Sequence, residues 1–432
     1  MVKVIGAGLA GCEAAWQLAE AGVDVLLYEM KPATFSPAHK YNGFAELVCS
    51  NSLKSALADS ASGLLKTEME MLGSLTVPCA RATAVEAGGA LAVDRERFST
   101  LVTEKIKAHP NIRTVTQEVT EIPKDTDVII ATGPLTADKL ALDIKKLCGE
   151  SLSFCDAAAP IITYESIDKE LVFFASRYGK GEADYINCPL NQEEYRNFHE
   201  ALITAESAEL HGFEKEEFKV YEGCMPIETL AKRGEDSIRF GPMKPVGLTD
   251  PRSGRRPYAN VQLRKENTDG TLYNLVGFQT NLKFPEQKRV FSLITGLQNA
   301  EFVRYGVMHR NTFIDSPKLL SHDLSMKEYP RIFFAGQITG VEGYMESAVC
   351  GIIAGTNLAR RLSGLPPLKL PLETMSGALI AHVTNSFSGN FQPMGANMGI
   401  LPPLPERVKG KRERYAVYAG RAIEAMKTEV IQ

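Results

Sequence analysis

The chain has 432 residues, of which 44 % are hydrophobic and 23 % are charged, a composition that is ordinary for a soluble globular protein. It excludes a mainly disordered chain, and no apolar run approaches the roughly 20 residues that a membrane-spanning helix needs. The length predicts two or three domains, and the net charge of −4, taken alone, disfavours a nucleic-acid partner.

The N-terminal segment has the pattern of a nucleotide-binding strand–turn–helix unit. Val2–Ile5 is a short apolar run typical of a buried parallel strand, and the glycine turn Gly6–Gly11 follows it directly. Cys12–Ala21 reads as a helix, and Val23–Tyr28 reads as a second strand that ends at Glu29. This order of elements predicts a dinucleotide-binding unit.

Each glycine of the turn has a distinct role in such a unit. Gly6 permits the tight turn, Gly8 lets the backbone approach a pyrophosphate, and Gly11 lets the helix pack against the strand. Glu29 lies 18 residues after Gly11, where a carboxylate can bind a ribose hydroxyl.

Two later segments indicate which dinucleotide is bound. Asp127–Ala131 reads as a strand that runs into Thr132-Gly133, and Arg331–Ala335 reads as another that runs into Gly336. A helical stretch follows from about Tyr344 to Leu362. These strand endings resemble the FAD-binding fold of the glutathione-reductase type. We therefore expect an α/β fold with a discontinuous Rossmann-type FAD domain, built from residues 1–157 and 301–432 with its C-terminal helices.

The middle of the chain, residues 158–300, differs in character. Short apolar runs alternate with polar helical stretches such as Glu193–Leu202, which predicts an inserted α+β domain. Leu230–Val290 contains 12 Lys/Arg and 6 Asp/Glu, a local balance of +6, so the rest of the chain carries −10. A second basic patch lies in Glu406–Arg421. The uneven distribution of charge reopens the question of a nucleic-acid partner.

Four basic residues of the middle region are candidates for phosphate contact. Arg252, Arg255 and Arg256 lie in a loop rich in Pro and Gly, and Lys244 lies close before it. A solvated loop explains them as well as contact with nucleic acid does.

The eight cysteines form no Cys-x-x-Cys pair, and no metal site is predicted. No signal-peptide pattern is visible, so we expect a cytoplasmic protein with free thiols. Cys49 precedes a predicted helix that extends to about Leu72 and is capped by a residue from Ser50 to Ser52. Cys224 precedes the helix-like Ile227–Lys232. Either thiol could be activated by a helix dipole, or could simply be packed at the boundary of an element.

Several motifs together identify a family. The sequence resembles the bacterial folate- and FAD-dependent tRNA uracil-5-methyltransferase (TrmFO) family along nearly its whole length. The matching stretches are Gly6–Gly11, Ala45–Lys54, Gly181–Pro189, Tyr221–Glu228, Phe240–Gly247, Thr271–Gln279, Arg304–Thr312 and Ala335–Ser347.

The resemblance implies a reaction and its participants. Members methylate C5 of the T-loop uridine (position 54) of tRNA, with methylenetetrahydrofolate as carbon donor and FAD, reduced by NADPH or NADH, as reductant. It implies that Cys224 adds to uracil C6 and that Cys49 acts beside the flavin, assisting methylene handling or C5 deprotonation. The FAD-binding residues implied with the glycine turn and Glu29 are Ala7, Leu9, Ala10, Gly133, Gly336, Gln337, Gly340, Gly343 and Tyr344, and the tRNA-binding residues are Lys244, Arg252, Arg255 and Arg256.

Three other functions remain open from the sequence. A GidA-type flavoprotein that modifies the wobble uridine shares the Ala335–Ser347 pattern but has a further C-terminal helical region. A small-molecule FAD oxidoreductase of the disulfide-reductase kind needs a Cys-x-x-Cys pair. A non-catalytic RNA-binding flavoprotein needs no activated thiol.

Overall fold

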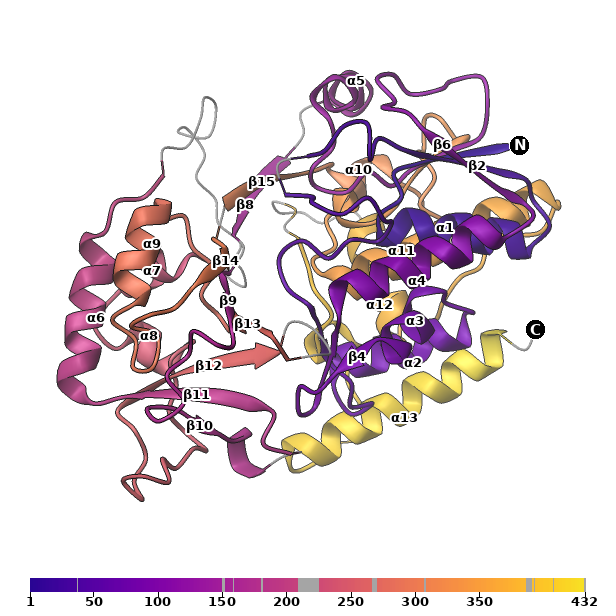
Figure 1. The fold of residues 1–432 in the computed structure, drawn as a ribbon. Coiled ribbons are helices and arrows are strands. Elements are labelled where there is room, and N and C mark those ends of the chain that lie inside the picture. Colours follow the sequence, from indigo (N-terminus) through magenta and orange to yellow (C-terminus); the bar gives the residue numbers. More distant parts are fainter. Residues whose placement is uncertain are drawn as a thin grey trace.

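Two β-sheets with separate hydrophobic cores organise the chain in a computed structural model (Figure 1). The structure describes residues 1–36, 38–149, 152–157, 159–179, 182–208, 225–265, 270–306, 308–385, 391, 393–406 and 408–430. Within these residues, no helix has the length and apolar character needed to cross a membrane.

The first sheet joins the two ends of the chain. Its five parallel strands lie in the order β16-β7-β1-β2-β6. The strands predicted at Val2–Ile5, Val23–Tyr28, Asp127–Ala131 and Arg331–Ala335 are confirmed as β1, β2, β7 and β16. These strands are short and apolar because both faces of the sheet are covered. Their bounds are β1 Val2–Ile5, β2 Val25–Glu29, β6 Ile112–Thr116, β7 Val128–Ile130 and β16 Ile332–Phe334.

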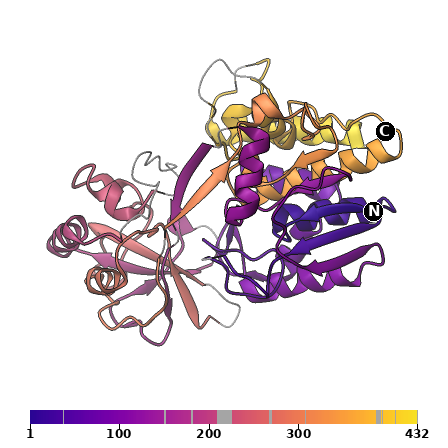
Figure 2. The same cartoon turned by 90° about the horizontal axis from the view of Figure 1, so that it is seen from above.

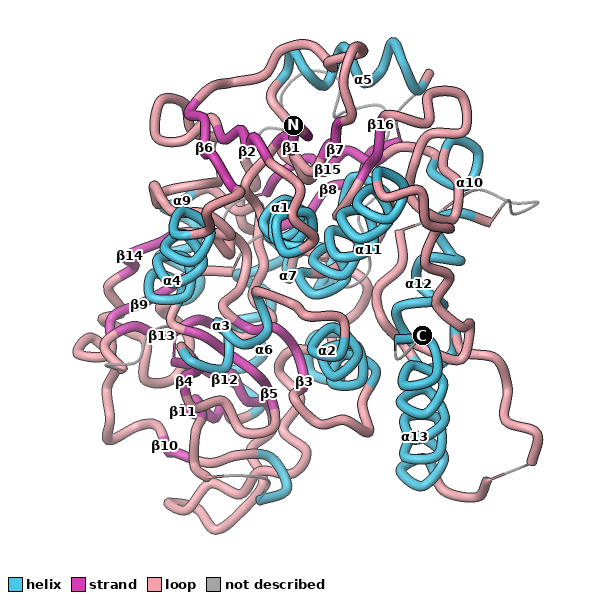
Figure 3. Tube along the Cα trace, turned by 90° about the vertical axis from the view of Figure 1, so that its right-hand side faces the viewer, coloured by secondary structure: helices cyan, strands magenta, loops and turns pink. Residues whose placement is uncertain are grey.

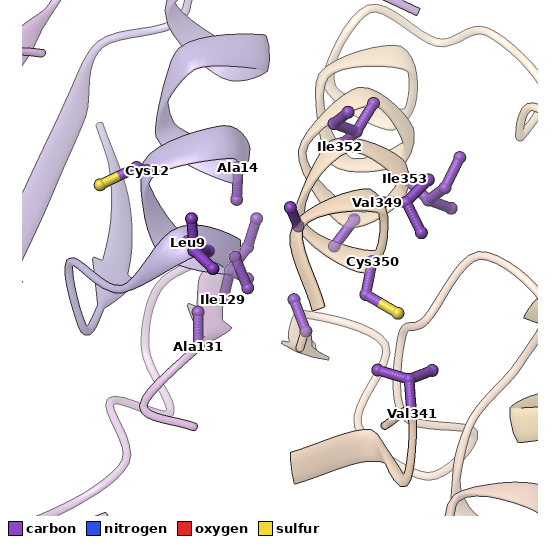
Figure 4. Close-up of a cluster of buried hydrophobic side chains, with 14 of the residues drawn as sticks. Leu9, Cys12, Ala14, Ile129, Ala131, Val341, Val349, Cys350, Ile352 and Ile353 are labelled. Carbon is purple, nitrogen blue, oxygen red and sulfur yellow. The ribbon is translucent and has the colours of Figure 1, made fainter. Parts of the chain in front are cut away.

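Helices α1 (Leu9–Glu20) and α11 (Tyr344–Leu362) pack closely together beside this sheet. A Cβ atom on Gly351 would lie 2.1 Å from the carbonyl oxygen of Ala10, so only glycine permits this approach. Figure 4 shows buried side chains of both helices, among them Leu9 and Val349, lining their shared core. The predicted late helix is confirmed with its bounds.

The second sheet belongs to the middle of the chain and is antiparallel, in the order β10-β11-β12-β13-β9-β14. Its strands are β9 Ile161–Thr163, β10 Phe173–Phe174, β11 Tyr185–Leu190, β12 Ala259–Lys265, β13 Leu272–Leu275 and β14 Phe302–Arg304. The helices on this sheet are α6 Gln192–Thr204, α7 Ile227–Ala231, α8 Ser237–Phe240 and α9 Phe284–Phe291. The helix predicted at Glu193–Leu202 is confirmed as α6.

A two-stranded ribbon connects the two parts of the molecule. Strand β8 (Leu152–Ala157) leads toward the second sheet, and β15 (Met308–Phe313) returns beside it in antiparallel register. Figure 2 shows this ribbon between the two bodies.

The remaining elements surround the first sheet. A small sheet of β3 (Ser52–Ser55), β4 (Ala84–Val85) and β5 (Ala90–Val93) lies below it. Figure 3 shows the C-terminal helix α13 beside α2 and below α12. The helices are α2 Ala61–Met71, α3 Thr76–Ala82, α4 Arg95–Ala108, α5 Asp138–Cys148, α10 Ser316–Leu319, α12 Met375–Thr384 and α13 Lys411–Val430.

The helix predicted directly after Cys49 is wrong in its first half. Ser52–Ser55 forms strand β3, which pairs with β5, and α2 begins only at Ala61. Ser60 caps α2 by accepting the N–H of Gly63 at 3.1 Å. Cys49 is therefore not at the start of a helix, and a helix dipole cannot activate its thiol.

Candidate active site

A pocket opens at the carboxyl ends of strands β1, β2, β7 and β16, where α/β sheets usually bind nucleotides. The predicted cofactor residues that line it are Gly6, Ala7, Gly8, Leu9, Ala10, Glu29, Gly133, Gly336, Gln337 and Tyr344. Three others predicted for the cofactor, Gly11, Gly340 and Gly343, lie outside the lining.

The turn before α1 leaves the start of that helix open to a ligand. Gly8 is the N-cap of α1 with no side-chain cap, and a Cβ atom there would meet nothing within 4 Å. A Cβ on Gly6 would lie 2.7 Å from the Ala131 oxygen, and one on Gly11 would lie 1.8 Å from the Gly6 oxygen. Gly6 and Gly11 thus permit close packing, and Gly8 leaves backbone N–H groups available to a pyrophosphate.

Glu29 anchors the turn from the end of β2. Its carboxylate accepts the N–H of Ala7 at 2.9 Å and the N–H of Lys31 at 3.0 Å. Each carboxylate oxygen has a second lone pair, so Glu29 can still accept a ribose hydroxyl. A dinucleotide such as FAD fits this pocket. The helix start is open, the Glu29 carboxylate can accept a further hydrogen bond, and the lining extends to Gly133 and Tyr344.

The late glycines have structural roles near the pocket. Gly336 has φ +86°, and a Cβ atom there would lie 2.8 Å from the Cβ of Ala10. Gly340 also has φ +86° and packs against the ring of Phe391, which a Cβ would approach to 2.5 Å. Gly343, with φ +128°, is the N-cap of α11. These positions let the segment between β16 and α11 fold tightly over the pocket.

Cys49 lies next to the pocket through Tyr344. The Tyr344 hydroxyl oxygen is 2.9 Å from Cys49 Sγ, and it accepts the backbone N–H groups of Cys49 at 2.8 Å and Ser50 at 3.2 Å. Two N–H donors occupy both lone pairs of the hydroxyl, so its own proton points to the sulfur. Burial raises the pKa of Tyr344 well above its usual value, which keeps that proton in place.

Three arginines from distant parts of the chain hold the loop that carries Cys49. Arg95 of α4 donates to the carbonyl of Leu47 at 2.9 Å. Arg304 of β14 donates to the carbonyl of Val48. Arg264 of β12 donates to Ser50 Oγ at 2.9 Å and to Asn51 Oδ1 at 3.1 Å.

These arginines were not predicted, because the contacts join residues that are far apart in the sequence. Arg264 is buried, with 7 % of its surface exposed, although it belongs to the second sheet and contacts a loop of the first part. The hydrogen bond from Tyr344 favours negative charge on the Cys49 sulfur, and the arginines fix the loop that presents this thiol to Tyr344. They replace the helix dipole as the physical basis for a reactive thiol.

Five other cysteines whose side chains the structure describes have apolar, buried or half-buried surroundings. Burial raises the pKa of Cys79 to about 11 and the pKa of Cys148 and Cys350 to about 12. Cys12 and Cys188 are completely buried. These thiols are packing groups, as predicted for most of the cysteines.

Cys224 lies outside the described residues, which resume at Met225. Pro226 is the N-cap of α7, one position before the predicted first helical residue. Glu228 of this helix is buried and accepts the Thr280 hydroxyl and the Asn281 N–H, both at 2.8 Å. These bonds fix α7 against the segment after β13.

The predicted phosphate-binding residues lie on the surface of the second part. Lys244, Arg255 and Arg256 are exposed, and their side chains form no ion pair with any described residue. Arg252 pairs with Asp250 at 3.1 Å, so its charge is largely neutralised. In the C-terminal basic patch, Arg421 donates to backbone carbonyls, whereas Lys409, Lys411, Arg412 and Arg414 are exposed.

Comparison with known proteins gives matches along the whole chain. The model of the family "Glucose inhibited division protein A" matches residues 1–366. The methylenetetrahydrofolate--tRNA-(uracil-5-)-methyltransferase TrmFO of Heliobacterium modesticaldum is 58 % identical, over 98 % of this chain and 97 % of its own length. The enzyme of the same name from Enterococcus faecalis is 55 % identical, over 100 % and 98 %.

Solved structures support the fold. The structure of GidA from Aquifex aeolicus superposes with a TM-score of 0.71 at 17 % identity, covering all of this chain and 73 % of that chain. A second crystal form of the same protein gives a TM-score of 0.70. The predicted FAD-binding α/β fold is thereby confirmed. On its family match and its full-length similarity to these relatives, the chain belongs to the TrmFO family, within the wider family of glucose-inhibited division protein A.

Proposed function

We propose that this protein is a methylenetetrahydrofolate--tRNA-(uracil-5-)-methyltransferase that forms 5-methyluridine in the T-loop of tRNA, at position 54. The observation that carries the proposal is the Cys49 site. A thiol that accepts a hydrogen bond from Tyr344, on a loop held by three arginines, lies beside a dinucleotide pocket. Full-length identity of 55–58 % to relatives of that name supports this reaction.

In this proposal the two thiols, Cys224 and Cys49, have different chemical roles. Cys224 adds as a thiolate to uracil C6, which gives C5 the character of an enolate carbon that can attack an activated methylene. Cys49 would act on the side of the site next to Tyr344, whose hydroxyl donates a hydrogen bond to its sulfur and stabilises the thiolate. In this way Cys49 can take the proton that leaves C5 or assist transfer of the methylene.

The pocket residues hold the cofactor that supplies the reducing equivalents. Of the residues that line the pocket, Gly8 and the first turn of α1 would hold the pyrophosphate, Glu29 would hold the ribose, and Gly336, Gln337 and Tyr344 would hold the flavin. When bound and reduced by NADPH or NADH, FAD supplies the hydride that converts the transferred methylene to methyl.

The two parts of the chain take separate tasks in this proposal. The part built on the first sheet binds FAD. The part built on the second sheet extends past the predicted boundary at residue 300, because β14 pairs with β9, and it binds tRNA through Lys244, Arg255 and Arg256, with Arg252 in a lesser role. Exposed arginine and lysine side chains without internal partners suit a phosphate backbone. We place the protein in the cytoplasm, where tRNA and reduced folates are available.

The test is to incubate the protein with unmodified tRNA, methylenetetrahydrofolate and NADPH and to analyse the nucleosides by mass spectrometry. We expect 5-methyluridine that depends on the folate. Cys224→Ala and Cys49→Ala should each abolish it while FAD remains bound. Product that is equal with and without folate would refute the proposal, and a retained rate in Cys224→Ala would refute the role of that thiol.

A further inference from the structure

Phe240 is the most exposed large hydrophobic side chain among the described residues, with 70 % of its surface accessible. It is the last residue of α8 and contributes to neither hydrophobic core of the two sheets. A single exposed hydrophobic side chain is common on protein surfaces, so the neighbours of Phe240 decide whether the ring has a role.

One arginine packs against the ring, and its guanidinium is also paired with Asp236 at 3.2 Å. The Arg239 guanidinium is 5.4 Å from the centroid of Phe240 and 4.1 Å from that of Tyr258. Arg239 also donates to the carbonyl of Tyr258 at 3.0 Å, which ties α8 to the strand after the basic loop. Lys244 is exposed on the same segment, and the Met243 carbonyl before it accepts the N–H of Asn260 at 2.9 Å. Phe240 and the phosphate-binding candidates therefore share one surface.

The same surface adjoins the helix that follows Cys224 in the sequence. Helix α7 begins at Ile227, and its Leu230 side chain lies 3.5 Å from the position of a Cβ atom on Gly241, directly after Phe240. A group that stacks on Phe240 would thus be held beside α7.

A flat π-face beside a basic surface matches one kind of ligand better than others. An apolar protein partner would leave Lys244 without a counter-charge, whereas RNA offers both a flat base and a phosphate next to it. Unstacked bases of RNA loops are the ones that stack on aromatic side chains. We propose, building on the function above, that Phe240 is a stacking platform for an unstacked base of the tRNA loop that carries the target uridine.

Binding of unmodified tRNA to the FAD-loaded protein tests this role, with the dissociation constant measured over a series of salt concentrations. Phe240→Ala should weaken binding by roughly 5-fold to 150-fold. The slope of log affinity against log salt should stay unchanged, because no phosphate contact is lost. Phe240→Trp should keep the affinity, since it keeps a π-face, and Phe240→Leu should lose it.

Leu142 provides a matched control. It is 60 % exposed on α5, at a distance from α8 (Figure 1), so Leu142→Ala should bind tRNA like the wild type. FAD content and thermal unfolding should be unchanged in all variants. A blunt RNA duplex without a loop should bind equally to the wild type and to Phe240→Ala.

Three results would overturn the proposal for Phe240. They are wild-type affinity in Phe240→Ala, wild-type affinity in Phe240→Leu, and a loss of affinity accompanied by a smaller salt slope. A fall from dimer to monomer in Phe240→Ala by light scattering, with RNA affinity unchanged, would assign the ring to contact between copies instead. A wild-type protein that forms no 5-methyluridine would contradict the proposed function itself, which separates that failure from the others.

Discussion

The substitution Tyr344→Phe tests the hydrogen bonds that define the Cys49 site. It keeps the ring in the lining of the pocket and removes only the hydroxyl. That hydroxyl accepts two backbone N–H groups and lies 2.9 Å from Cys49 Sγ. A hydrogen bond to a charged acceptor contributes about 1.5–3 kcal/mol, which corresponds to a thiolate population lower by roughly 10-fold to 150-fold.

The expected change in reactivity is smaller than the change in population. A thiolate that loses a stabilising donor becomes more nucleophilic, with a Brønsted coefficient of about 0.4–0.5, and this recovers close to half of the logarithmic loss. The rate of Cys49 alkylation near neutral pH should therefore fall by roughly 4-fold to 15-fold. The pH at which the rate reaches half its plateau should move upward.

Alkylation by iodoacetamide, followed peptide by peptide with mass spectrometry across a pH series, measures this change. The buried thiols with raised pKa, such as Cys79 and Cys350, react slowly and serve as internal references. Tyr28→Phe removes a hydroxyl from the same pocket lining and should leave the Cys49 profile unchanged. An identical rate and midpoint in Tyr344→Phe, with FAD bound, would refute a bond from Tyr344 to the sulfur.

Three further changes test the RNA surface, the helix packing and a buried carboxyl. Arg255→Ala combined with Arg256→Ala should weaken tRNA binding and reduce the magnitude of the salt slope by about 2, with FAD content unchanged, and an unchanged slope would remove both residues from the interface. Gly351→Ala places a Cβ 2.1 Å from a backbone oxygen of α1, so it should lower the free energy of unfolding, measured with urea, by about 3 kcal/mol. Gly420→Ala on α13 places a Cβ with nothing within 4 Å, so it should raise the free energy of unfolding by about 0.5–1 kcal/mol. Burial raises the pKa of Glu68 to about 7. The stability that the protonated Glu68 contributes is complete below the unfolded pKa of about 4.3 and is lost as the pH rises through about 7. Between about pH 4 and pH 8, the free energy of unfolding of the wild type should therefore fall by about 3 kcal/mol relative to that of Glu68→Gln. Parallel unfolding curves for the two proteins at both pH values would contradict that shift.

Local sequence patterns were sufficient where local physics decides the structure. The strand at Val2–Ile5, the glycine turn and the helix at Tyr344–Leu362 follow from apolar runs, positive-φ glycines and helix ends that lie within a few residues of one another. Gly364, with φ +72°, directly follows the residue that caps the end of α11. The predicted bounds of that helix were therefore accurate.

Prediction failed where a distant partner competes with a local preference. Three consecutive residues, Ser50 to Ser52, are all good helix caps, and the sequence favoured a helix there. In the structure Ser52 pairs with Ala92 of β5, and Ser60 takes the cap. A strand partner 40 positions away has no signature in a local window.

The contacts around Cys49 could not be predicted from the sequence for the same reason. Tyr344 is 295 positions from Cys49, and Arg264 is 214 positions from Ser50. Both residues lie in or near motifs, yet nothing in the motifs indicates that they meet at one thiol. Most of the residues that line the pocket could be predicted because their pattern is local, whereas the contacts around Cys49 depend on how the second sheet docks onto the first part.

The measurement that tests the central claim most directly follows the carbon itself. The protein is given unmodified tRNA, NADPH and methylenetetrahydrofolate labelled with ¹³C at the methylene, and the digested nucleosides are analysed by mass spectrometry. We expect the label in the methyl group of 5-methyluridine from the T-loop fragment, and no label there with Cys49→Ala. Label that appears in a wobble-position nucleoside instead, or 5-methyluridine that carries no label, would contradict it.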